Sequence, residues 1–204
     1  MKKKLLVIVT CLIVFSAGVK AQFWEQLSFQ ALAGYTNAQG SKFKTESGQK
    51  LSSFGLNFDI DVLYHFNALD NKLGVGLTWD GSVLFAADLD GFSKGGVYGL
   101  QLVGPKAQYR FLSRNISPYV ALSFGGARLS TPNVTISDGS GNSVEVLANK
   151  AWNFGVRPEV GVDLNGFIIS VAYIVPMQYD LGSIKETAGG LEFSIGYRKT
   201  IFYW

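Results

Sequence analysis

The side chains that most often perform catalysis or bind metals are scarce in this chain of 204 residues. It contains one histidine, His65, and one cysteine, Cys11. No cluster of His and Cys metal ligands can therefore be built, and a serine or acid–base enzyme would have to use His65. A G-x-S-x-G motif occurs at Gly91–Gly95, with Ser93 at its centre. That motif works at a turn between a strand and a helix, whereas the glycine-rich surroundings of Ser93 predict a loop. We expect no catalytic residue.

One segment resembles the beginning of a calcium-binding loop. Asp138 to Asn142 read Asp-Gly-Ser-Gly-Asn, but the glycine expected at position six and the glutamate expected at position twelve are missing. Alternating apolar residues flank the segment at 134–136 and 144–146, a pattern typical of a hairpin. We therefore predict a projecting hairpin here, and neither a metal nor a cofactor.

Charged residues of both signs form the remaining set of candidates. They could line a path for a charged solute, or they could pair with one another and fill the space between them. The set comprises Asp59, Asp61, Lys72, Asp80, Lys106, Arg110, Arg157, Glu159, Asp163, Glu192 and Arg198. The choice between these two chemistries depends on the elements that position the side chains.

The first 21 residues have the features of an export signal. Met1–Lys4 is basic, and residues 5–17 form an apolar run. Val19 and Ala21 then place side chains of small or moderate size at positions −3 and −1 before Gln22, as a signal-peptidase site requires. The apolar run is shorter than the ~20 residues that a membrane-spanning helix needs. We therefore expect a cleaved signal peptide at 1–21 and a single domain at 22–204.

Removal of this signal would change the charge of the protein. Four of the 18 basic residues are lysines of the signal, which leaves 14 basic and 15 acidic residues and a net charge of −1. This balance gives no reason to expect binding to nucleic acid. Cys11 would also be lost, so the exported chain would have no disulfide to stabilise it.

Alternation with a period of two dominates the rest of the chain and predicts β-strands. In residues 54–66 the even positions are all apolar or aromatic, while the odd positions are mostly glycine or polar; residues 152–164 repeat the pattern. A soluble sandwich or a lipocalin-like barrel would bury the apolar face. The long apolar faces, opposed by glycine and paired charges, favour the inverse arrangement, with lipid outside and a narrow polar lumen inside.

Eight segments show this alternation, and several reach the ~9–11 residues of a membrane-spanning strand. They lie at 26–36, 51–66, 72–85, 97–111, 117–129, 151–164, 167–179 and 190–203. The connections alternate between long and short, and the shortest is Asn165-Gly166, a strong hairpin signal. Barrels of the outer membrane sort their loops in this way. The sequence therefore predicts an all-β, eight-stranded antiparallel up-and-down transmembrane β-barrel.

Further details of the barrel follow from the same pattern. The alternation breaks at Val103-Gly104-Pro105, where a bulge would fit. Aromatic residues near the strand ends predict two girdles. The short-turn girdle would contain Tyr64, Phe66, Tyr109, Phe111 and Phe167, and the long-loop girdle Tyr35, Phe54, Trp152 and Tyr179. The bore of an eight-stranded barrel is filled by side chains, so the charged set is expected to plug the lumen as a paired network.

Four short motifs carry a resemblance to a known family. They are Ala21-Gln22, Pro118-Tyr119-Val120, Gly196-Tyr197-Arg198 and the aromatic finish Ile201-Phe202-Tyr203-Trp204. With them, residues 22–204 resemble the small Gram-negative outer-membrane β-barrel proteins of the porin-family or OmpA/OmpX-like type. The chain departs from the usual ending because Lys199-Thr200-Ile201 follows the Gly-Tyr-Arg motif.

The resemblance implies a location and a set of partners. The chain would lie in the outer membrane, in contact with lipid and lipopolysaccharide. Periplasmic chaperones and the barrel-assembly machinery would act during its assembly. The resemblance implies that Phe202, Tyr203 and Trp204 form the signal that this machinery reads. It implies no catalytic residue and names no external ligand.

These observations favour a non-enzymatic outer-membrane protein with a structural or surface-interaction role in its long outer loops. A small porin-like channel would need more strands or a lumen free of charge pairs. A lipid-modifying barrel enzyme would need a polar cluster with a histidine near the outer rim, whereas His65 is predicted at the opposite end. A lipocalin-like binder would remain soluble in the periplasm.

The predicted topology can be tested by proteolysis of intact cells. We expect an external protease to cleave within 37–50 and 130–150, because these loops are polar and carry Gly, Ser and Lys without a long apolar run. Immunoblotting of the fragments gives the position of each cut. Protection of both loops together with cleavage at 67–71 would invert the topology.

Overall fold

A computed structural model describes the part of the chain that forms the predicted sheet. The described residues are 26–41, 52–87, 96–112, 115–131, 134–137, 143–146, 149–181 and 185–200. The expected signal peptide, the Gly91–Gly95 motif, residues 138–142 and the predicted assembly signal Phe202, Tyr203 and Trp204 lie outside these ranges.

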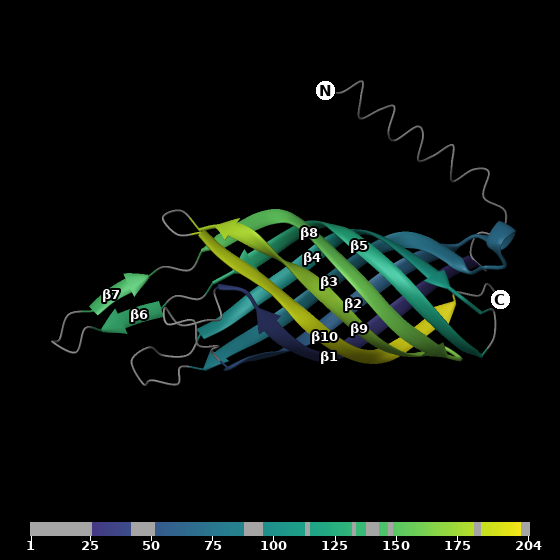
Figure 1. The fold of residues 1–204 in the computed structure, drawn as a ribbon, viewed down its shortest axis with the longest axis horizontal. Coiled ribbons are helices and arrows are strands. Elements are labelled where there is room, and N and C mark those ends of the chain that lie inside the picture. The colour runs from purple at the N-terminus through teal and green to yellow at the C-terminus, as the bar shows by residue number, and fades with distance from the viewer. Residues whose placement is uncertain are drawn as a thin grey trace, which may run out of the picture.

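Eight antiparallel strands close into one up-and-down barrel (Figure 1). They are β1 Leu27–Gln39, β2 Ser52–His65, β3 Leu73–Ala87, β4 Gly96–Arg110, β5 Ile116–Ser130, β8 Lys150–Leu164, β9 Phe167–Asp180 and β10 Lys185–Thr200. Neighbours along the chain are neighbours in the barrel, and β1 pairs with β10 to close it. The predicted fold is confirmed.

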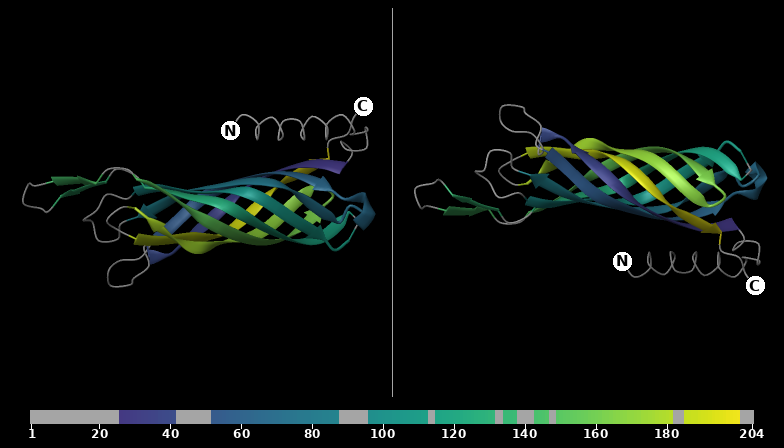
Figure 2. Two further views of the ribbon diagram at one scale, coloured as in Figure 1. Left: turned by 90° about the horizontal axis from the view of Figure 1, so that it is seen from above. Right: turned by 90° about the horizontal axis from the view of Figure 1, so that it is seen from below.

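A two-stranded hairpin extends from one end of the barrel (Figures 1 and 2). It consists of β6 Val134–Ser137 and β7 Ser143–Val146, which pair with each other in a separate sheet. The predicted hairpin across 134–146 is therefore confirmed. The start of β1 and the end of β10 lie at the opposite end of the barrel (Figure 2). We call the hairpin end the loop end, and the opposite one the turn end.

The turn end is formed by short connections with residues suited to tight turns. Asn165 and Gly166 have φ angles of 56° and 94°, as the two central residues of a type I′ hairpin turn require. The connection from β2 to β3 contains the short 3₁₀ helix η3, Asn67–Leu69, followed by Asp70 and Asn71 with φ angles of 52° and 57°. Asp and Asn tolerate this left-handed region better than most residues.

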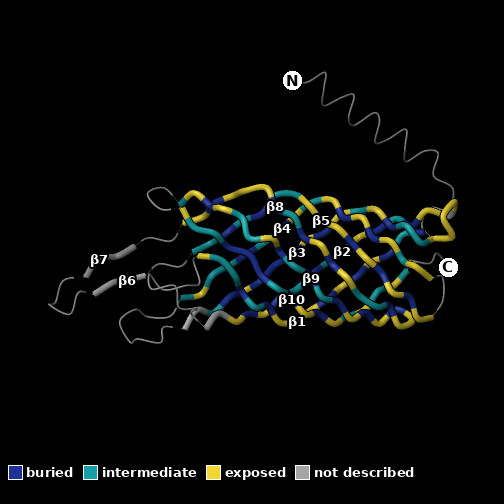
Figure 3. The backbone as a smooth tube through the Cα atoms, viewed as in Figure 1, coloured by how far each residue is buried: buried dark blue, intermediate teal, exposed yellow. Residues whose placement is uncertain are grey.

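Buried and exposed residues alternate along the strands (Figure 3). Most of the large apolar side chains belong to the exposed positions. In β1 the pattern alternates from Ser28 to Ala38 with few exceptions. Large apolar side chains on the outer face are widely exposed: Leu56 is 63% exposed, Leu77 66% and Phe154 63%. Buried positions on the inner face are largely polar, glycine or small. The chain is therefore patterned inside-out relative to a water-soluble barrel.

The interior is layered along the barrel axis. Apolar residues fill the loop end, where Leu84, Leu100, Leu129, Ile174 and Tyr179 belong to one buried cluster. Buried charged residues lie in the middle of the strands. A smaller apolar cluster lies between these charges and the turn end, and comprises Leu32, Tyr119, Ala121 and Ile168.

The predicted bulge in β4 is wrong. The pairing of β4 with β3 keeps one register from Leu73↔Tyr109 to Ala86↔Gly96, and its pairing with β5 resumes unchanged beyond Pro105. The alternation breaks in the sequence because Leu100 and Leu102 face inward, into the apolar layer at the loop end. An inward leucine looks like a change of phase although the backbone continues without interruption.

An irregularity does occur between β9 and β10. The register shifts between Ala188 and Gly190, so that Val175 and Pro176 of β9 face the single residue Gly189 of β10. Beyond this bulge the faces of β9 are exchanged, because one extra residue reverses the alternation. Tyr179 was expected in the long-loop girdle, on the outward face of the barrel. It points inward instead and is fully buried.

The eighth strand also differs from its predicted range of 190–203. It begins at Lys185, five residues earlier than predicted. The prediction missed Lys185–Gly189 because this segment contains no large apolar residue and therefore shows no alternation. No helix of the described residues is long and apolar enough to cross a membrane.

The outward orientation of Phe58 gives a depth-dependent prediction. Phe58 lies in the middle of β2 and packs edge-on against Trp79, with ring centroids 5.2 Å apart. Replacing Phe58 by Arg should destabilise the barrel in bilayers by ~2–4 kcal/mol, and Phe54→Arg near the strand end by at most ~1 kcal/mol. Urea unfolding in lipid vesicles measures both. If Phe58→Arg folds as well as the unaltered chain while Asn57→Leu fails, the lipid-facing assignment is wrong.

Candidate functional site

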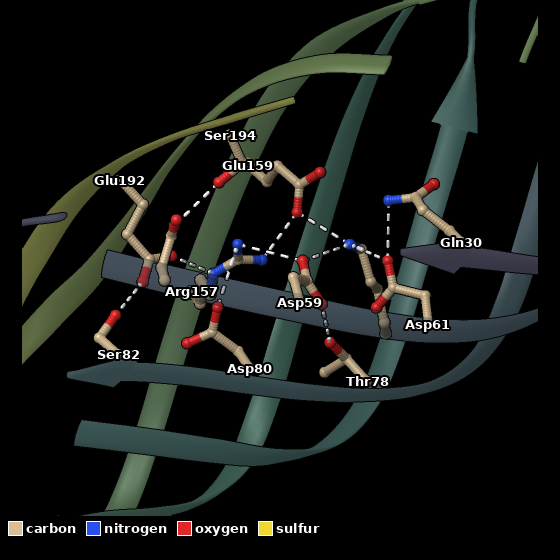
Figure 4. A network of polar contacts seen from close by, with 12 residues as sticks. Gln30, Asp59, Asp61, Thr78, Asp80, Ser82, Arg157, Glu159, Glu192 and Ser194 are labelled. Atoms are coloured by element: carbon tan, nitrogen blue, oxygen red, sulfur yellow. Dashed lines mark hydrogen bonds and ion pairs between the residues drawn. The ribbon is translucent and has the colours of Figure 1, made fainter. Parts of the chain in front are cut away.

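The candidate site is a network of buried charges in the middle of the lumen (Figure 4). Seven of the eleven predicted residues meet there. They are Asp59 and Asp61 of β2, Asp80 of β3, Lys106 of β4, Arg157 and Glu159 of β8, and Glu192 of β10. Each lies on the inward period of its strand and is at most 2% exposed. We call this set the lumen network.

Arg157 makes the largest number of charged contacts in the lumen network. Its Nε donates to Glu192 Oε2 at 2.8 Å, and its Nη1 donates to Glu159 Oε2 at 2.7 Å. Its Nη2 lies 3.2 Å from Asp59 Oδ2 and 3.4 Å from Asp80 Oδ2. The guanidinium therefore joins carboxylates from four strands across the bore.

Lys106 provides the second positive charge. Its Nζ lies 2.6 Å from Asp61 Oδ2, 2.8 Å from Glu159 Oε2 and 3.5 Å from Asp59 Oδ2. Asp59 and Glu159 thus contact both cations and join them into one cluster. Such pairing offsets part of the large cost of removing a charge from water.

Neutral donors complete the hydrogen bonds of the carboxylates. Gln30 Nε2 donates to Asp61 at 2.9 Å, and Thr78 Oγ1 donates to Asp59 at 3.0 Å. Ser82 Oγ donates to Glu192 at 2.9 Å, and Tyr119 OH donates to Glu159 at 2.6 Å. The sequence analysis assigned no role in the lumen to these four residues. Their position on the inward period of a strand, opposite the apolar face, is the signal that could have found them.

The five carboxylates of the lumen network outnumber its two cations. With all groups ionised, the network has a formal charge of −3. Asp80 has the fewest partners, since its oxygens have no hydrogen bond among the described residues and contact only Arg157 at 3.4 Å. The network is held together by its cations, so loss of Arg157 would leave like charges buried together.

A second charged cluster lies at the turn end. Arg198 forms an ion pair with Asp163, and Arg110 Nη1 lies 4.0 Å from the same carboxylate. Arg110 also donates to the carbonyl of Asn71 at 2.5 Å, and Asp163 accepts a hydrogen bond from the Gly166 amide at 2.7 Å. This cluster therefore ties two turns to the lumen and is separate from the lumen network.

Lys72 belongs to neither cluster. Its Nζ lies 3.6 Å from Asp70 Oδ2, in a pair whose side chains are 29% and 80% exposed. The expectation that Lys72 faces inward on a strand is wrong, because β3 begins only at Leu73 and Lys72 belongs to the preceding turn.

His65 contacts a serine that the sequence analysis did not consider. Ser28 Oγ lies 2.8 Å from His65 Nε2, inside the barrel near the turn end. A catalytic serine–histidine pair needs a third group that orients the imidazole. His65 Nδ1 has no hydrogen-bond partner among the described residues, and Ser28 is fully buried. The pair fits a structural contact. The described residues also contain no group of three or more His, Cys, Asp or Glu able to hold a metal ion.

The closed sheet, the inside-out pattern and the charged interior together define a class of protein. The chain has the fold of the small eight-stranded barrels of Gram-negative outer membranes. Among solved structures, it is similar to Ail, the attachment invasion locus protein of Yersinia pestis, in a complex with the heparin analogue sucrose octasulfate. The identity is 18% and the TM-score 0.50, over 85% of this chain and 99% of that one.

A second solved structure gives the same result. Neisserial surface protein A is 18% identical with a TM-score of 0.51, over 86% of this chain and 97% of that one. At this level of identity the likeness concerns the fold. No protein-family model matches the chain, and none of the curated proteins matches it.

The lumen network predicts an unequal response to substitution. Replacing Arg157 by Met should lower the free energy of unfolding by ~3–5 kcal/mol, because four carboxylates lose their shared cation. Lys72→Met, at a surface pair, should cost only ~0–1 kcal/mol. Asp80→Asn should cost less than Arg157→Met, because it lowers the excess negative charge. Urea unfolding in vesicles compares the three variants, and equal costs for Arg157→Met and Lys72→Met would contradict the network.

Proposed function

We propose that the protein is a non-enzymatic integral protein of the outer membrane. The observation that carries the proposal is the inside-out pattern: apolar side chains such as Leu77 and Phe154 are more than 60% exposed, while Arg157 and Lys106 are fully buried. In water this arrangement would be unfavourable, whereas in a bilayer both sets of residues are matched to their surroundings. The pairing of β1 with β10 also closes the sheet and removes the two edge strands that an open sheet would have, as a span through lipid requires.

The proposed orientation places the loop end outside the cell and the turn end in the periplasm. Short periplasmic turns and longer outer connections are the usual arrangement in such barrels. The turn end carries Asn165-Gly166 and the first and last strand ends, while the loop end carries the β6–β7 hairpin. A structural or surface-interaction role would then reside in the outer connections. Outer-membrane lipid and lipopolysaccharide are the proposed partners, with chaperones and the barrel-assembly machinery acting during biogenesis.

The lumen network supports a closed bore rather than a pore. Side chains fill the interior of an eight-stranded barrel, and here Arg157 and Lys106 join carboxylates that project from β2, β3, β8 and β10. A solute that passed through would have to break these ion pairs. The apolar layer around Leu100 and Leu129 adds a second barrier at the loop end.

Fractionation of cells that produce the protein tests this proposal. The folded chain should appear in the outer-membrane fraction and should migrate on gels at a different rate before and after boiling. Proteins of stable transmembrane barrels behave in this way because their sheet resists detergent until it is heated. Recovery in the soluble periplasmic fraction, with migration unaffected by boiling, would favour a lipocalin-like binder instead.

Planar-bilayer recording tests the closed lumen. The unaltered protein should give no steady conductance, because the residues that pair with Arg157 extend into a narrow bore that side chains fill. Arg157→Ala removes the guanidinium and should raise the frequency of conducting events. Steady conductance of the unaltered protein that does not change in Arg157→Ala would favour the small porin-like channel.

A further inference from the structure

A pocket opens at the turn end of the barrel, where the β8–β9 turn meets the last residues of β10. Its volume is about 340 Å³, within the ~300–1,000 Å³ of typical ligand sites. Its described lining residues are Asn115, Asp163, Asn165, Gly166 and residues 197–200 of β10. No residue of the lumen network lines it. We call this cavity the turn-end pocket.

Positive charge prevails around the turn-end pocket. Arg198 and the exposed Lys199 line it, and Arg110 lies close to Arg198 because both guanidinium groups approach the Asp163 carboxylate. Within the described part of the chain, Asp163 is the only carboxylate that forms ion pairs with these three cations. One of its oxygens also accepts a hydrogen bond from the Gly166 amide. Three cations around one carboxylate leave a formal excess of two positive charges, which favours an anion as ligand.

The β8–β9 turn holds Arg198 in position. The Arg198 amide donates a hydrogen bond to the Gly166 carbonyl at 2.7 Å, and the Arg198 guanidinium forms its ion pair with Asp163 of the same turn. The Tyr197 ring lies against Gly166, since a Cβ atom built on this glycine would come within 3.1 Å of the ring. A cation that is already fixed loses little conformational freedom when it binds an anion, so binding costs less entropy.

The polar residues of the turn-end pocket suit the oxygens of a phosphate group. Arginine presents a planar fork of N–H donors and lysine a compact ammonium, and neither accepts a hydrogen bond. Asn115, Asn165 and Thr200 also line the pocket and have side chains able to donate. Phosphate oxygens accept strong, charge-assisted hydrogen bonds from such a set. A metal ion or a cationic ligand would instead be repelled by Arg198 and Lys199.

The outward face of β10 indicates the depth of the turn-end pocket in the proposed membrane. Toward the turn end this face carries Ile195 and Tyr197, each 56% exposed, and then Lys199. The exposed Phe29 of β1 pairs with Lys199, and the exposed Phe167 of β9 pairs with Tyr197. Aromatic side chains concentrate at the boundary between lipid and water, and Lys199 lies two residues, ~7 Å, beyond Tyr197. Lys199 is therefore placed at the level of lipid headgroups.

We propose that the turn-end pocket binds a phosphate group, with Arg198 and Lys199 as its two cationic contacts. The phosphate belongs to a phospholipid headgroup of the adjacent leaflet or is free in the surrounding water, and both sources present the same oxygens to the pocket. The lipid source rests on the proposed membrane location of the barrel. Binding of free phosphate requires only the folded barrel.

Amide NMR titrations of the protein folded in a phosphate-free maltoside detergent test the site. One arm adds inorganic phosphate against sodium chloride of matched ionic strength. The other adds dihexanoyl phosphatidylglycerol against dihexanoylglycerol, which has the same acyl chains but no phosphate. The amide signals of Gly166, Lys199 and Thr200 should shift and saturate with at least one phosphate compound, while that of Gly190 at the loop end of β10 stays in place. Saturation in one arm alone identifies the source of the phosphate.

Two lysine variants provide the matched comparison. Lys199→Gln removes a cation of the pocket and should raise the dissociation constant roughly fivefold or more, because a charge-assisted hydrogen bond is lost. Lys72→Gln removes the same charge at the same end of the barrel, from an exposed pair with Asp70 outside the pocket. It should change the dissociation constant by less than about twofold, because charges exposed to water are screened. Gel migration before and after boiling verifies that both variants fold.

Three outcomes would overturn the proposal. These are the absence of a saturating shift with either phosphate compound, equal shifts with dihexanoylglycerol and the phospholipid, and equal weakening by Lys199→Gln and Lys72→Gln. If Lys199→Gln does not fold, the unaltered chain decides: shifts confined to the pocket support the site, and equal shifts of the Lys72 amide contradict it.

Flotation with phosphatidylglycerol vesicles separates this proposal from the proposed membrane location. A barrel that floats with the vesicles but shows no saturating shift rejects the pocket and keeps the membrane location. A protein that does not float rejects the membrane location, and the titration with inorganic phosphate then decides the pocket alone.

Discussion

Burial of the Arg157 guanidinium is the constraint on which the interior of the barrel depends. An arginine stays charged under all ordinary conditions, so it can lie in a space without water only if acceptors surround it. Carboxylates from β2, β3, β8 and β10 converge on it. This convergence requires strands that are distant in the sequence to face one another across a narrow bore, which only a closed sheet provides. Asp59, Glu159 and Glu192 receive further hydrogen bonds or ion pairs from Lys106 and from neutral side chains, whereas Asp80 is held by Arg157.

The period of two was sufficient to predict the fold. In an eight-stranded barrel, inward and outward positions have opposite environments, so alternation locates the strands and also the lumen. The two-residue turn at Asn165-Gly166 fixed the β8–β9 hairpin. Seven charged residues on the inward period meet in one cluster, and three more form the cluster around Asp163. For these residues, the strand phase was the only information needed.

The features that sequence analysis missed arise where alternation carries no information. Leu100 and Leu102 are apolar on the inner face, so they imitate a bulge that the backbone does not have. Tyr179 points inward because an extra residue in β9 reverses its phase, and nothing in the side chains around Pro176 indicates that change. Lys72 lies one residue before its strand. Gln30 and Tyr119 donate hydrogen bonds to the carboxylates of Asp61 and Glu159. These partners can be identified only once the barrel is closed.

The pairing of β1 with β10 has a consequence for the way this chain folds. Ser28 lies beside Thr200, and Gln39 beside Gly189, so the ladder that closes the barrel joins the two ends of the sheet. Every other interface of the barrel joins strands that follow one another along the chain. The β1–β10 interface joins the first strand to the last, so it cannot form until the last strand is in place. Contacts so distant in sequence slow folding, because loop closure must occur before they contribute. Until that moment the two edges of the sheet are unpaired and exposed to aggregation.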